Sequence, residues 1–260
     1  MSGDEANNLI SPERWRLRHL PWEGCLNVRD VGGYPTTDGR HTRWHAIVRA
    51  DNLALLTEAG RAALVAYGVR SIIDLRRPHE VEQSPNPFAH VGPHDIAYAN
   101  ISFGDPAVAP PTGGSLADRY QRSLVLFPHR IAAIMQTIAY ASPGSVVLYC
   151  NAGKDRTGII VALLLELVGV ARPTIVADYA LSVERLRLRD ETSLAGEAGE
   201  RAQQEQEVAA EEPRAEVMQV VLEYLDEWYR GTEMYLREAG VASEAILRLR
   251  ERLLPAATGL

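Results

Sequence analysis

The residues best suited to chemistry lie in one segment, CNAGKDRTG, at residues 150–158. A short apolar run leads into Cys150, Arg156 follows six positions later, and an apolar helical pattern begins directly after it. Inward-facing backbone N–H groups in such a loop form a concave anion site, and the helix N-terminus adds the positive end of its dipole. An arginine offers a planar fork for two phosphate oxygens, and positive surroundings favour a nucleophilic thiolate. The segment therefore predicts a phosphate site with Cys150 as the nucleophile.

The other residues of this segment fit the same chemistry. Glycine lets the backbone turn sharply and approach a ligand closely. Lys154 adds positive charge at the mouth of the pocket, and Thr157 is placed to donate its hydroxyl to the thiolate. No set of His, Cys, Asp and Glu residues has the spacing of metal ligands, so we expect no metal and no cofactor. We predict that the substrate is bound by Asn151, Ala152, Gly153, Lys154 and Thr157.

The elements that must position this segment follow from hydrophobic periodicity and turn residues. Thr57 is a good N-cap for a helix over residues 58–67, and Gly68 is placed to end it. The last third of the chain is predicted to be helical, with one apolar stripe on residues 217–228. Strands that alternate with helices indicate an α/β fold, with a mainly parallel sheet between helices and a helical C-terminal extension. Further strands are expected at residues 46–49, 69–75, 94–101 and 145–149, and further helices at 116–126, after Pro128 and at 157–168.

The net charge of −7 is concentrated in one place. Residues 190–212 contain eight acidic residues and one basic residue, and the rest of the chain carries both signs in equal number. This distribution argues against a nucleic-acid-binding protein, which needs a clustered basic surface. We interpret the chain as a single domain over residues 1–260, with a flexible tail at 1–12 and an acidic insertion at 190–212 that is either a solvated helix or mobile.

The cellular location is predicted from three features. The two cysteines, Cys25 and Cys150, are too few for a disulfide framework and favour a reducing compartment. No apolar run is long enough to span a bilayer, and the N-terminus lacks the basic-then-apolar pattern of a signal peptide. We therefore expect a cytoplasmic enzyme without stable membrane insertion, and export without a signal peptide stays open. The sequence does not indicate the oligomeric state.

The pattern Cys-x-x-Gly-Lys-Asp-Arg-Thr-Gly resembles the signature loop of cysteine-based protein tyrosine phosphatases. More narrowly, it is similar to the bacterial and fungal tyrosine-phosphatase-like family with a Lys-Asp-Arg loop. Residues 27–34, 49–53, 73–76 and 235–241 also match the pattern of that family. One departure is Tyr149, because tyrosine phosphatases usually carry a histidine there that tunes the thiolate.

The resemblance implies that Cys150 attacks phosphorus in line and forms a phosphocysteine, while Arg156 and the loop amides hold the equatorial oxygens. A phosphotyrosine protein is the expected substrate, or another phosphomonoester. Relatives also accept phosphoserine, phosphothreonine or phosphoinositides, so a dual-specificity or phosphoinositide phosphatase is the alternative, and the extra cation Lys154 suits it. A non-catalytic phosphate-binding module is a more remote alternative.

Two aspartates are candidates for the proton donor that helps the leaving group depart. Asp155 lies inside the loop and is the acid proposed for the family with the Lys-Asp-Arg loop. Asp105 follows a predicted strand, in a loop where other tyrosine phosphatases place their acid. We favour Asp155, although it could instead cap a helix that begins at Thr157, and Asp105 also suits ordinary turn chemistry beside Pro106.

Two further segments of the resemblance are expected to support the fold. In residues 27–34 the pair Gly32–Gly33 suits a turn that needs positive φ, and Arg29 and Asp30 are placed to brace it. Residues 73–76 end a predicted central strand with Asp74 and Arg76. We favour a structural ion pair beneath the loop over a direct catalytic role for these two side chains.

Overall fold

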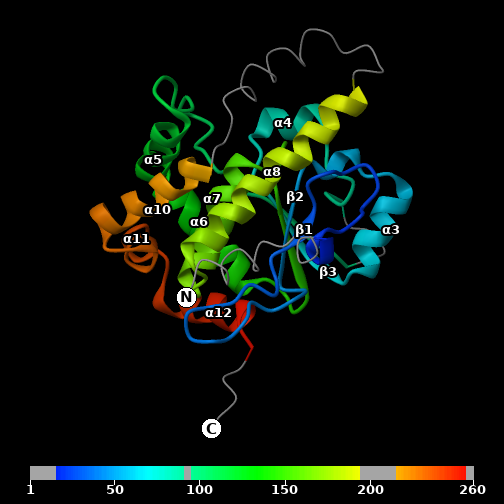
Figure 1. The fold of residues 1–260 in the computed structure, drawn as a ribbon. Helices are drawn as coiled ribbons and strands as arrows, with labels where there is room; N and C mark the ends of the chain where they lie inside the picture. Colours follow the sequence, from blue (N-terminus) through cyan, green and yellow to red (C-terminus); the bar gives the residue numbers. More distant parts are fainter. Residues whose placement is uncertain (1–15, 91–94, 194–214, 256–260) are drawn as a thin grey trace.

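The computed structural model describes residues 16–90, 95–193 and 215–255 (Figure 1). Within these residues the strands form one sheet in the order β1-β2-β5-β3-β4. Strands β2, β5, β3 and β4 run parallel, and β1 pairs antiparallel with β2 at the edge. The sheet is therefore mostly parallel, as the sequence predicts. Its strands are β1 (Arg29–Asp30), β2 (Ile47–Ala50), β3 (Val69–Asp74), β4 (Ala97–Asn100) and β5 (Ser145–Tyr149).

Helices cover both faces of the sheet (Figure 1). On one face a single apolar cluster joins the sheet to most of the helices, and on the other a smaller cluster joins it to α3 and to the segment around Trp22. Alternate residues of β5 enter the two clusters, Val146 and Leu148 the larger and Val147 and Tyr149 the smaller. The helices are η1 (Leu53–Leu55), α3 (Glu58–Ala66), α4 (Pro78–Gln83), α5 (Leu116–Leu126), α6 (Pro128–Tyr140), α7 (Asp155–Leu167), α8 (Arg172–Ser193), α10 (Ala215–Tyr229), α11 (Thr232–Glu238) and α12 (Ser243–Leu253).

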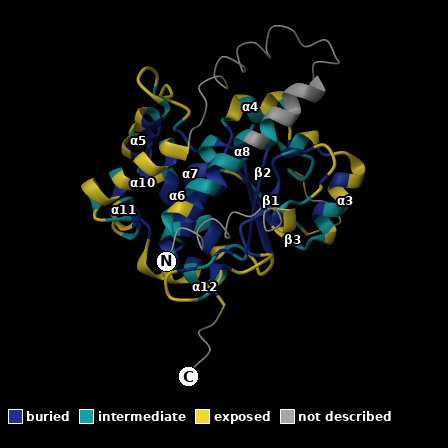
Figure 2. Ribbon diagram, viewed as in Figure 1, coloured by how far each residue is buried: buried dark blue, intermediate teal, exposed yellow. Residues whose placement is uncertain are grey.

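Helix α7 occupies the centre of the molecule, between the sheet and α8 (Figure 2). Nearly all of its side chains are buried, because it is apolar on every side. Its first turn follows the end of β5 after only five residues, 150–154. The chain between them is therefore fixed at both ends by buried elements.

Most of the predicted elements are confirmed. Helix α3 is capped by Thr57, whose hydroxyl accepts a hydrogen bond of 3.1 Å from the N–H of Gly60, and Gly68 follows it with φ of 87°. Strand β5 and helix α5 have the predicted bounds. Two details were wrong. Helix α7 begins at Asp155, two residues early. The predicted apolar stripe of α10 includes two exposed residues, Val220 and Trp228, because the fully buried positions of this helix are Met218, Val221, Leu222 and Leu225.

Two predicted features lie wholly or mostly outside the described residues. The tail at 1–12 is one of them. Of the acidic segment at 190–212, residues 190–193 are the end of α8 and the remainder is not described. In the part of the chain that is described, every helix is too short or too polar to cross a membrane.

Candidate active site

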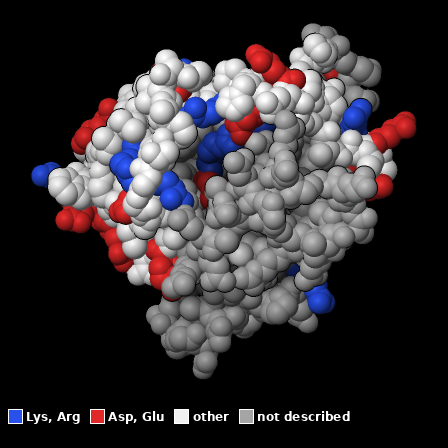
Figure 3. Space-filling model, turned by 90° about the horizontal axis from the view of Figure 1, so that it is seen from above, with Lys and Arg blue, Asp and Glu red and all other residues white. Residues whose placement is uncertain are grey.

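Cys150 lies at the carboxyl edge of the sheet, directly after the central strand β5. Ligands of open α/β sheets bind at this edge, outside the ends of parallel strands. Figure 3 looks onto it and shows a hollow with Lys or Arg side chains inside and acidic side chains beside them. The thiol of Cys150 is free and only 2% exposed. The nucleophile predicted from sequence therefore sits at the base of the loop that leads into α7.

The loop is tied to the scaffold by its carbonyl groups. The three consecutive carbonyls of residues 151–153 accept hydrogen bonds from the N–H of Asn52 at 3.0 Å, from Nδ2 of Asn27 at 2.9 Å and from Nη2 of Arg49 at 2.7 Å. In a trans peptide unit the N–H points away from the C=O. The N–H groups of residues 152–154 therefore face the opposite side, and none of them meets an acceptor among the described residues. This arrangement suits an anion.

Gly153 is required by this geometry. Its φ is 64°, a conformation that other residues rarely adopt. A Cβ atom at this position would also lie 2.4 Å from the carbonyl oxygen of Ala50. The loop therefore packs backbone against backbone on β2, which brings its carbonyls within reach of the donors on that side.

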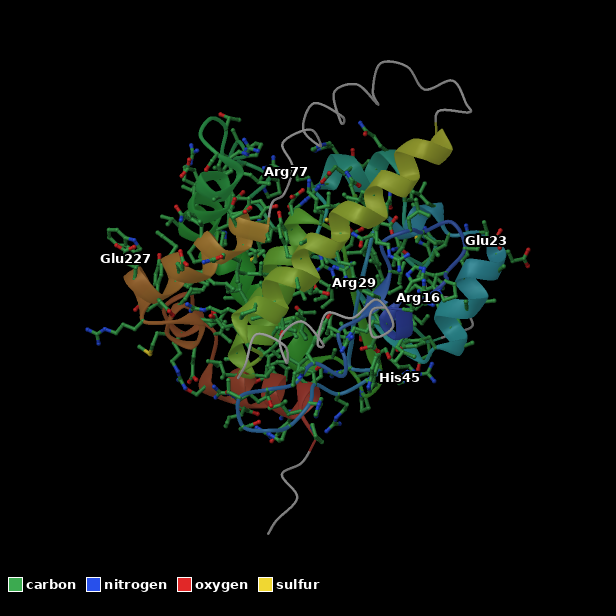
Figure 4. All side chains as sticks on the ribbon, in the orientation of Figure 1. Arg16, Glu23, Arg29, His45, Arg77 and Glu227 are labelled. Atoms are coloured by element: carbon green, nitrogen blue, oxygen red, sulfur yellow. The ribbon has the colours of Figure 1, made fainter. Side chains whose placement is uncertain are left out.

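Asp178 of α8 holds two of the three donors, Arg49 directly and Asn27 through Arg29. Its carboxylate forms an ion pair with Nε of Arg29 at 2.8 Å and another with Arg49, and it accepts a hydrogen bond of 2.9 Å from the hydroxyl of Tyr34. Burial alone would raise the pKa of Asp178, but the two guanidinium groups hold it well below its usual range. Figure 4 labels Arg29, a residue of β1, beside α8. Asp178 therefore joins β1, β2 and the loop through one buried charge cluster.

Residues 27–34 are architectural, with one correction. Asp30 braces the turn by accepting hydrogen bonds from the N–H groups of Gly32 at 2.6 Å and His45 at 2.8 Å. Arg29 does not brace it, because its side chain turns towards Asp178. Of the two glycines only Gly33 has positive φ, 72°, whereas Gly32 is needed because a Cβ there would lie 2.6 Å from Cα of Trp44.

Arg156 is held by Glu80, a residue of α4 that the sequence did not single out. Nη1 and Nη2 of Arg156 donate to the two carboxylate oxygens at 2.6 and 2.8 Å, and Nδ2 of Asn151 donates to the same carboxylate at 2.6 Å. A guanidinium has five N–H groups, so the edge formed by Nε and Nη2 keeps two for a second acceptor. The pair Pro78 and Glu80, at the first and third positions of a helix, is a start signature, but it does not identify a partner for Arg156.

The charges at Arg156 reinforce one another. Burial alone would lower the pKa of Arg156, but the hydrogen bonds to Glu80 and the negative charges of Cys150, Glu80 and Asp155 raise it above its usual value. For Glu80, burial acts to raise the pKa, and the contact with Arg156 outweighs this and lowers it. Arg156 therefore stays charged beside the thiol at any pH at which the protein is folded.

The two candidate aspartates have different surroundings. Asp155 is the first residue of α7, and its Oδ1 atom accepts a hydrogen bond from the hydroxyl of Tyr120 and lies 3.7 Å from Nζ of Lys154. It does not cap the helix, because the N-cap position is Lys154. Asp105 accepts a hydrogen bond of 2.9 Å from the N–H of Ala107 and lies 3.7 Å from Nε2 of His129. Within the described residues, no hydrogen bond or ion pair joins Asp105 to the loop.

Two other predicted binding residues are buried. Lys154 is 6% exposed, so it is not an ordinary surface lysine. Thr157 is 0% exposed, and its hydroxyl has no hydrogen-bond partner among the described residues, Cys150 included. A buried hydroxyl without a partner is unusual in a folded protein. Within the described residues, no three His, Cys, Asp or Glu side chains gather as metal ligands.

Tyr149, which replaces the expected histidine, faces a buried polar cluster on the face of the sheet that α3 covers. Its hydroxyl donates to Asp74 and accepts hydrogen bonds from Nη2 of Arg76 at 2.9 Å and from Nδ2 of Asn86 at 2.7 Å. Asp74 and Arg76 form an ion pair at 2.7 Å, with both side chains fully buried. The predicted structural ion pair is therefore present, and it includes the residue that precedes Cys150.

The chain is similar to known proteins over most of its length. The sequence profile of the tyrosine phosphatase family matches residues 20–255. A tyrosine-protein phosphatase of Nostoc commune is 36% identical over 227 residues, which cover 80% of this chain and 74% of that protein. The triple specificity protein phosphatase PtpB of Mycobacterium tuberculosis is 30% identical over 279 residues, which cover 92% of this chain and 99% of that protein.

Proposed function

This chain belongs to the tyrosine phosphatase family, and we propose that it hydrolyses phosphotyrosine through a phosphocysteine formed on Cys150. One observation carries the proposal. The carbonyls of residues 151–153 are all bonded to the scaffold, so that the N–H groups of residues 152–154 face away from it on the side that a phosphate would occupy. The buried thiol of Cys150 stands at the start of this loop and the fork of Arg156 at its end.

Substrate binding uses groups that the protein leaves available. The N–H groups of residues 152–154 donate hydrogen bonds to the equatorial oxygens of the phosphate, and the first turn of α7 adds the positive end of its dipole. Arg156 keeps its end-on contact with Glu80 and binds two phosphate oxygens through the edge of Nε and Nη2. Glu80 thus acts as a positioning residue, because it fixes the plane of the guanidinium before the substrate arrives.

The reaction has two steps. In the first, the thiolate of Cys150 attacks phosphorus, the S–P bond forms, the bond to the tyrosine oxygen breaks, and Asp155 gives its proton to that oxygen. In the second, water attacks the phosphocysteine, Asp155 takes a proton from the water, and the S–P bond breaks to release phosphate and the thiolate. Asp155 is favoured over Asp105 because it belongs to the loop that holds the phosphate. The Thr157 hydroxyl, which has no partner among the described residues, is placed to stabilise the departing thiolate.

A second candidate function is broader specificity. Lys154 is buried and adds a cation beside Asp155, which suits a substrate with a further negative charge. One relative is named a triple specificity phosphatase. Turnover of a phosphotyrosine peptide, a phosphoserine peptide and a soluble phosphoinositide, compared as kcat/KM, separates the two candidates. A preference of tenfold or more for the phosphotyrosine peptide favours the first.

The covalent mechanism is tested with Cys150→Ser. This variant removes the thiolate and keeps the N–H groups and Arg156, so hydrolysis of p-nitrophenyl phosphate should be abolished while inorganic phosphate still binds. Calorimetric titration with phosphate measures the binding. Turnover that persists in the variant contradicts the phosphocysteine. Phosphate binding by an unmodified protein that hydrolyses none of the substrates supports a non-catalytic binding module instead.

A further inference from the structure

We propose that Tyr120 is a positioning residue for proton transfer: its hydroxyl holds Oδ1 of Asp155 and leaves Oδ2 as the oxygen that carries the proton. Tyr179 supports it by a second hydrogen bond. The inference rests on the proposed function, since it concerns how Asp155 acts on the leaving group of the Cys150 reaction.

The contacts form a chain of three residues from three helices. The hydroxyl of Tyr120, on α5, bonds to Oδ1 of Asp155 at the start of α7, and it lies 2.9 Å from the hydroxyl of Tyr179 on α8. The two tyrosine rings pack edge to face, with centroids 6.2 Å apart and planes at 88°. They are 5% and 1% exposed. The chain is therefore held in one arrangement by packing as well as by hydrogen bonds.

The direction of the hydrogen bonds follows from the chemistry of the groups. An ionised carboxylate only accepts hydrogen bonds, so the single hydroxyl proton of Tyr120 is directed at Asp155. The oxygen of Tyr120 then accepts, and Tyr179 is the donor between the two phenols. Both bonds thus point towards the carboxylate, from the core of the protein outwards.

The two oxygens of Asp155 are not equivalent. Oδ1 receives the bond from Tyr120 and is also the atom that lies 3.7 Å from Nζ of Lys154. Oδ2 has no hydrogen bond or ion pair with a described residue, and the side chain is 37% exposed. When Asp155 binds a proton, the proton goes to Oδ2, because Oδ1 is occupied as an acceptor. Tyr120 therefore selects the oxygen that can reach the ester oxygen of a substrate.

The phenols do not supply the proton themselves. Burial raises the pKa of Tyr120 well above its usual value, and the nearby charge of Asp155 adds to the effect. Burial also raises the pKa of Tyr179, and Asp155 acts in the same direction. Both hydroxyls stay protonated over the working pH range, which leaves Asp155 as the group that exchanges a proton and Tyr120 as the group that orients it.

The sequence of α5 fixes where Tyr120 points. A capping box starts the helix, with the Ser115 hydroxyl accepting from the N–H of Asp118 at 3.2 Å and the Asp118 carboxylate accepting from the N–H of Ser115 at 2.8 Å. Ala117, Tyr120 and Leu124 lie three and four residues apart, so they share the buried face of the helix. Tyr120 is therefore presented to Asp155 by the same face that anchors α5 to the core.

The test compares two aryl phosphates in the variant Tyr120→Phe. Phenyl phosphate releases a phenol as basic as tyrosine and needs the proton, whereas p-nitrophenyl phosphate releases a much more acidic phenol and does not. Loss of orientation at Asp155 should lower kcat/KM about tenfold for phenyl phosphate, a part of the total effect of a general acid, and leave p-nitrophenyl phosphate within about twofold.

Tyr235→Phe is the matched control. Tyr235 is also buried, and its hydroxyl donates a bond of 2.9 Å to the carbonyl of Leu124 on the same helix, away from Asp155. A general loss of packing or of a buried hydrogen bond appears in this control equally with both esters. If Tyr120→Phe does not fold, Tyr179→Phe tests the same chain and should show a smaller loss with the same dependence on the ester.

Two outcomes overturn the proposal: equal losses with both esters in Tyr120→Phe, or a further loss from Tyr120→Phe when Asp155 is already asparagine. Neither of these affects the result expected for Cys150→Ser. Activity that depends on Cys150 but not on Tyr120 thus leaves the phosphatase proposal standing and removes only the role of Tyr120.

Discussion

The two sides of the loop at residues 150–156 are built in opposite ways. On the outer side, which faces β2 and the segment around Asn27, each carbonyl of residues 151–153 has a donor. Two of these donors, Asn27 and Arg49, are backed by the buried charge cluster of Asp178. On the inner side the N–H groups of residues 152–154 and the hydroxyl of Thr157 have no acceptor among the described residues. The protein satisfies the polar groups that set the shape of the loop, and it leaves unpaired those on the side where we propose that phosphate binds.

This difference has an energetic meaning. A buried polar group without a partner costs about 1–3 kcal/mol, and a satisfied hydrogen bond contributes about 1 kcal/mol net. The outer side should therefore supply stability and the inner side should supply function at some expense of stability. Substitutions on the two sides are expected to separate these properties.

The largest effect on stability is expected from a substitution in the Asp178 cluster, behind the outer side of the loop. Asp178→Asn removes the charge that compensates Arg29 and Arg49 while keeping the size of the side chain. Breaking a buried ion pair leaves an uncompensated buried charge, and the variant should lose about 3–5 kcal/mol of unfolding free energy. Urea denaturation measures the loss. Asp38→Asn is the control, because Asp38 pairs with Arg40 on the surface at 2.6 Å and its loss should change little.

The same variant should change the response to acid. The folded-state pKa of Asp178 is depressed, so its contribution is complete above the unfolded pKa of about 3.9 and is lost as pH falls below it. The wild type should therefore lose stability more steeply than Asp178→Asn between about pH 5 and pH 2. Parallel curves for the two proteins would contradict the assignment of this cluster as the base of the loop.

On the inner side, a large effect is expected on activity and not on stability. Arg156→Lys keeps the positive charge but removes the planar guanidinium, which can bond to Glu80 and to phosphate at the same time. The ammonium group of lysine is a single point of charge and lacks this fork. We expect kcat/KM for p-nitrophenyl phosphate to fall about 10²–10³-fold, as for the loss of a transition-state donor, with little change in the denaturation midpoint. A variant that keeps a tenth of the activity would show that charge alone is sufficient.

The residues that could be predicted from the sequence differ in kind from those that could not. Cys150, Arg156 and strand β5 were predictable because each belongs to a local pattern of a few residues. Glu80 and Asp178 were not, because each reaches the loop only through the tertiary fold, from helices far away in sequence.

The misplaced start of α7 has a physical reason too. Aspartate is favoured both as an N-cap and within the first helical turn, so Asp155 does not by itself fix where the helix begins. Local chemistry therefore pointed to Cys150 as the candidate nucleophile and to Arg156 as the candidate phosphate-binding fork, while the residues that orient them required the arrangement of the helices.

A moderate effect on activity is expected from Glu80→Gln, which tests whether Glu80 orients the guanidinium of Arg156. Glutamine keeps the size but provides one acceptor oxygen where the carboxylate provides two for Arg156. We expect a fall in kcat/KM of about tenfold, close to the loss of one charged hydrogen bond, and a rise in KM for p-nitrophenyl phosphate. Glu82→Gln on the same helix is the control, because its side chain is exposed and it should behave as wild type. Equal activity of the two variants would remove Glu80 from the site.

The smallest effect is expected when one buried threonine hydroxyl is deleted. The comparison of Thr157→Val with Thr42→Val is the most direct test, because the two variants should change the unfolding free energy in different directions. Thr157→Val deletes a buried hydroxyl that has no partner among the described residues, so the unfolding free energy should stay level or rise by up to about 1 kcal/mol. Thr42→Val deletes a buried hydroxyl that donates to the carbonyl of Val31 at 2.7 Å and accepts from the N–H of Tyr34 at 2.9 Å. That variant should lose about 1–3 kcal/mol, since both partners are left unsatisfied.

Catalysis should be affected by Thr157→Val and not by Thr42→Val, the reverse of the expected effects on stability. In Thr157→Val, kcat should fall severalfold while kcat/KM changes less, because the hydroxyl acts on the departing thiolate in the second step, and a larger initial burst of p-nitrophenol reports the accumulated phosphocysteine. Thr42→Val should keep both constants at temperatures where it is folded. If Thr157→Val is destabilised as much as Thr42→Val, the hydroxyl is satisfied in the folded protein, and the division of the loop into a structural and a functional side does not hold at this residue.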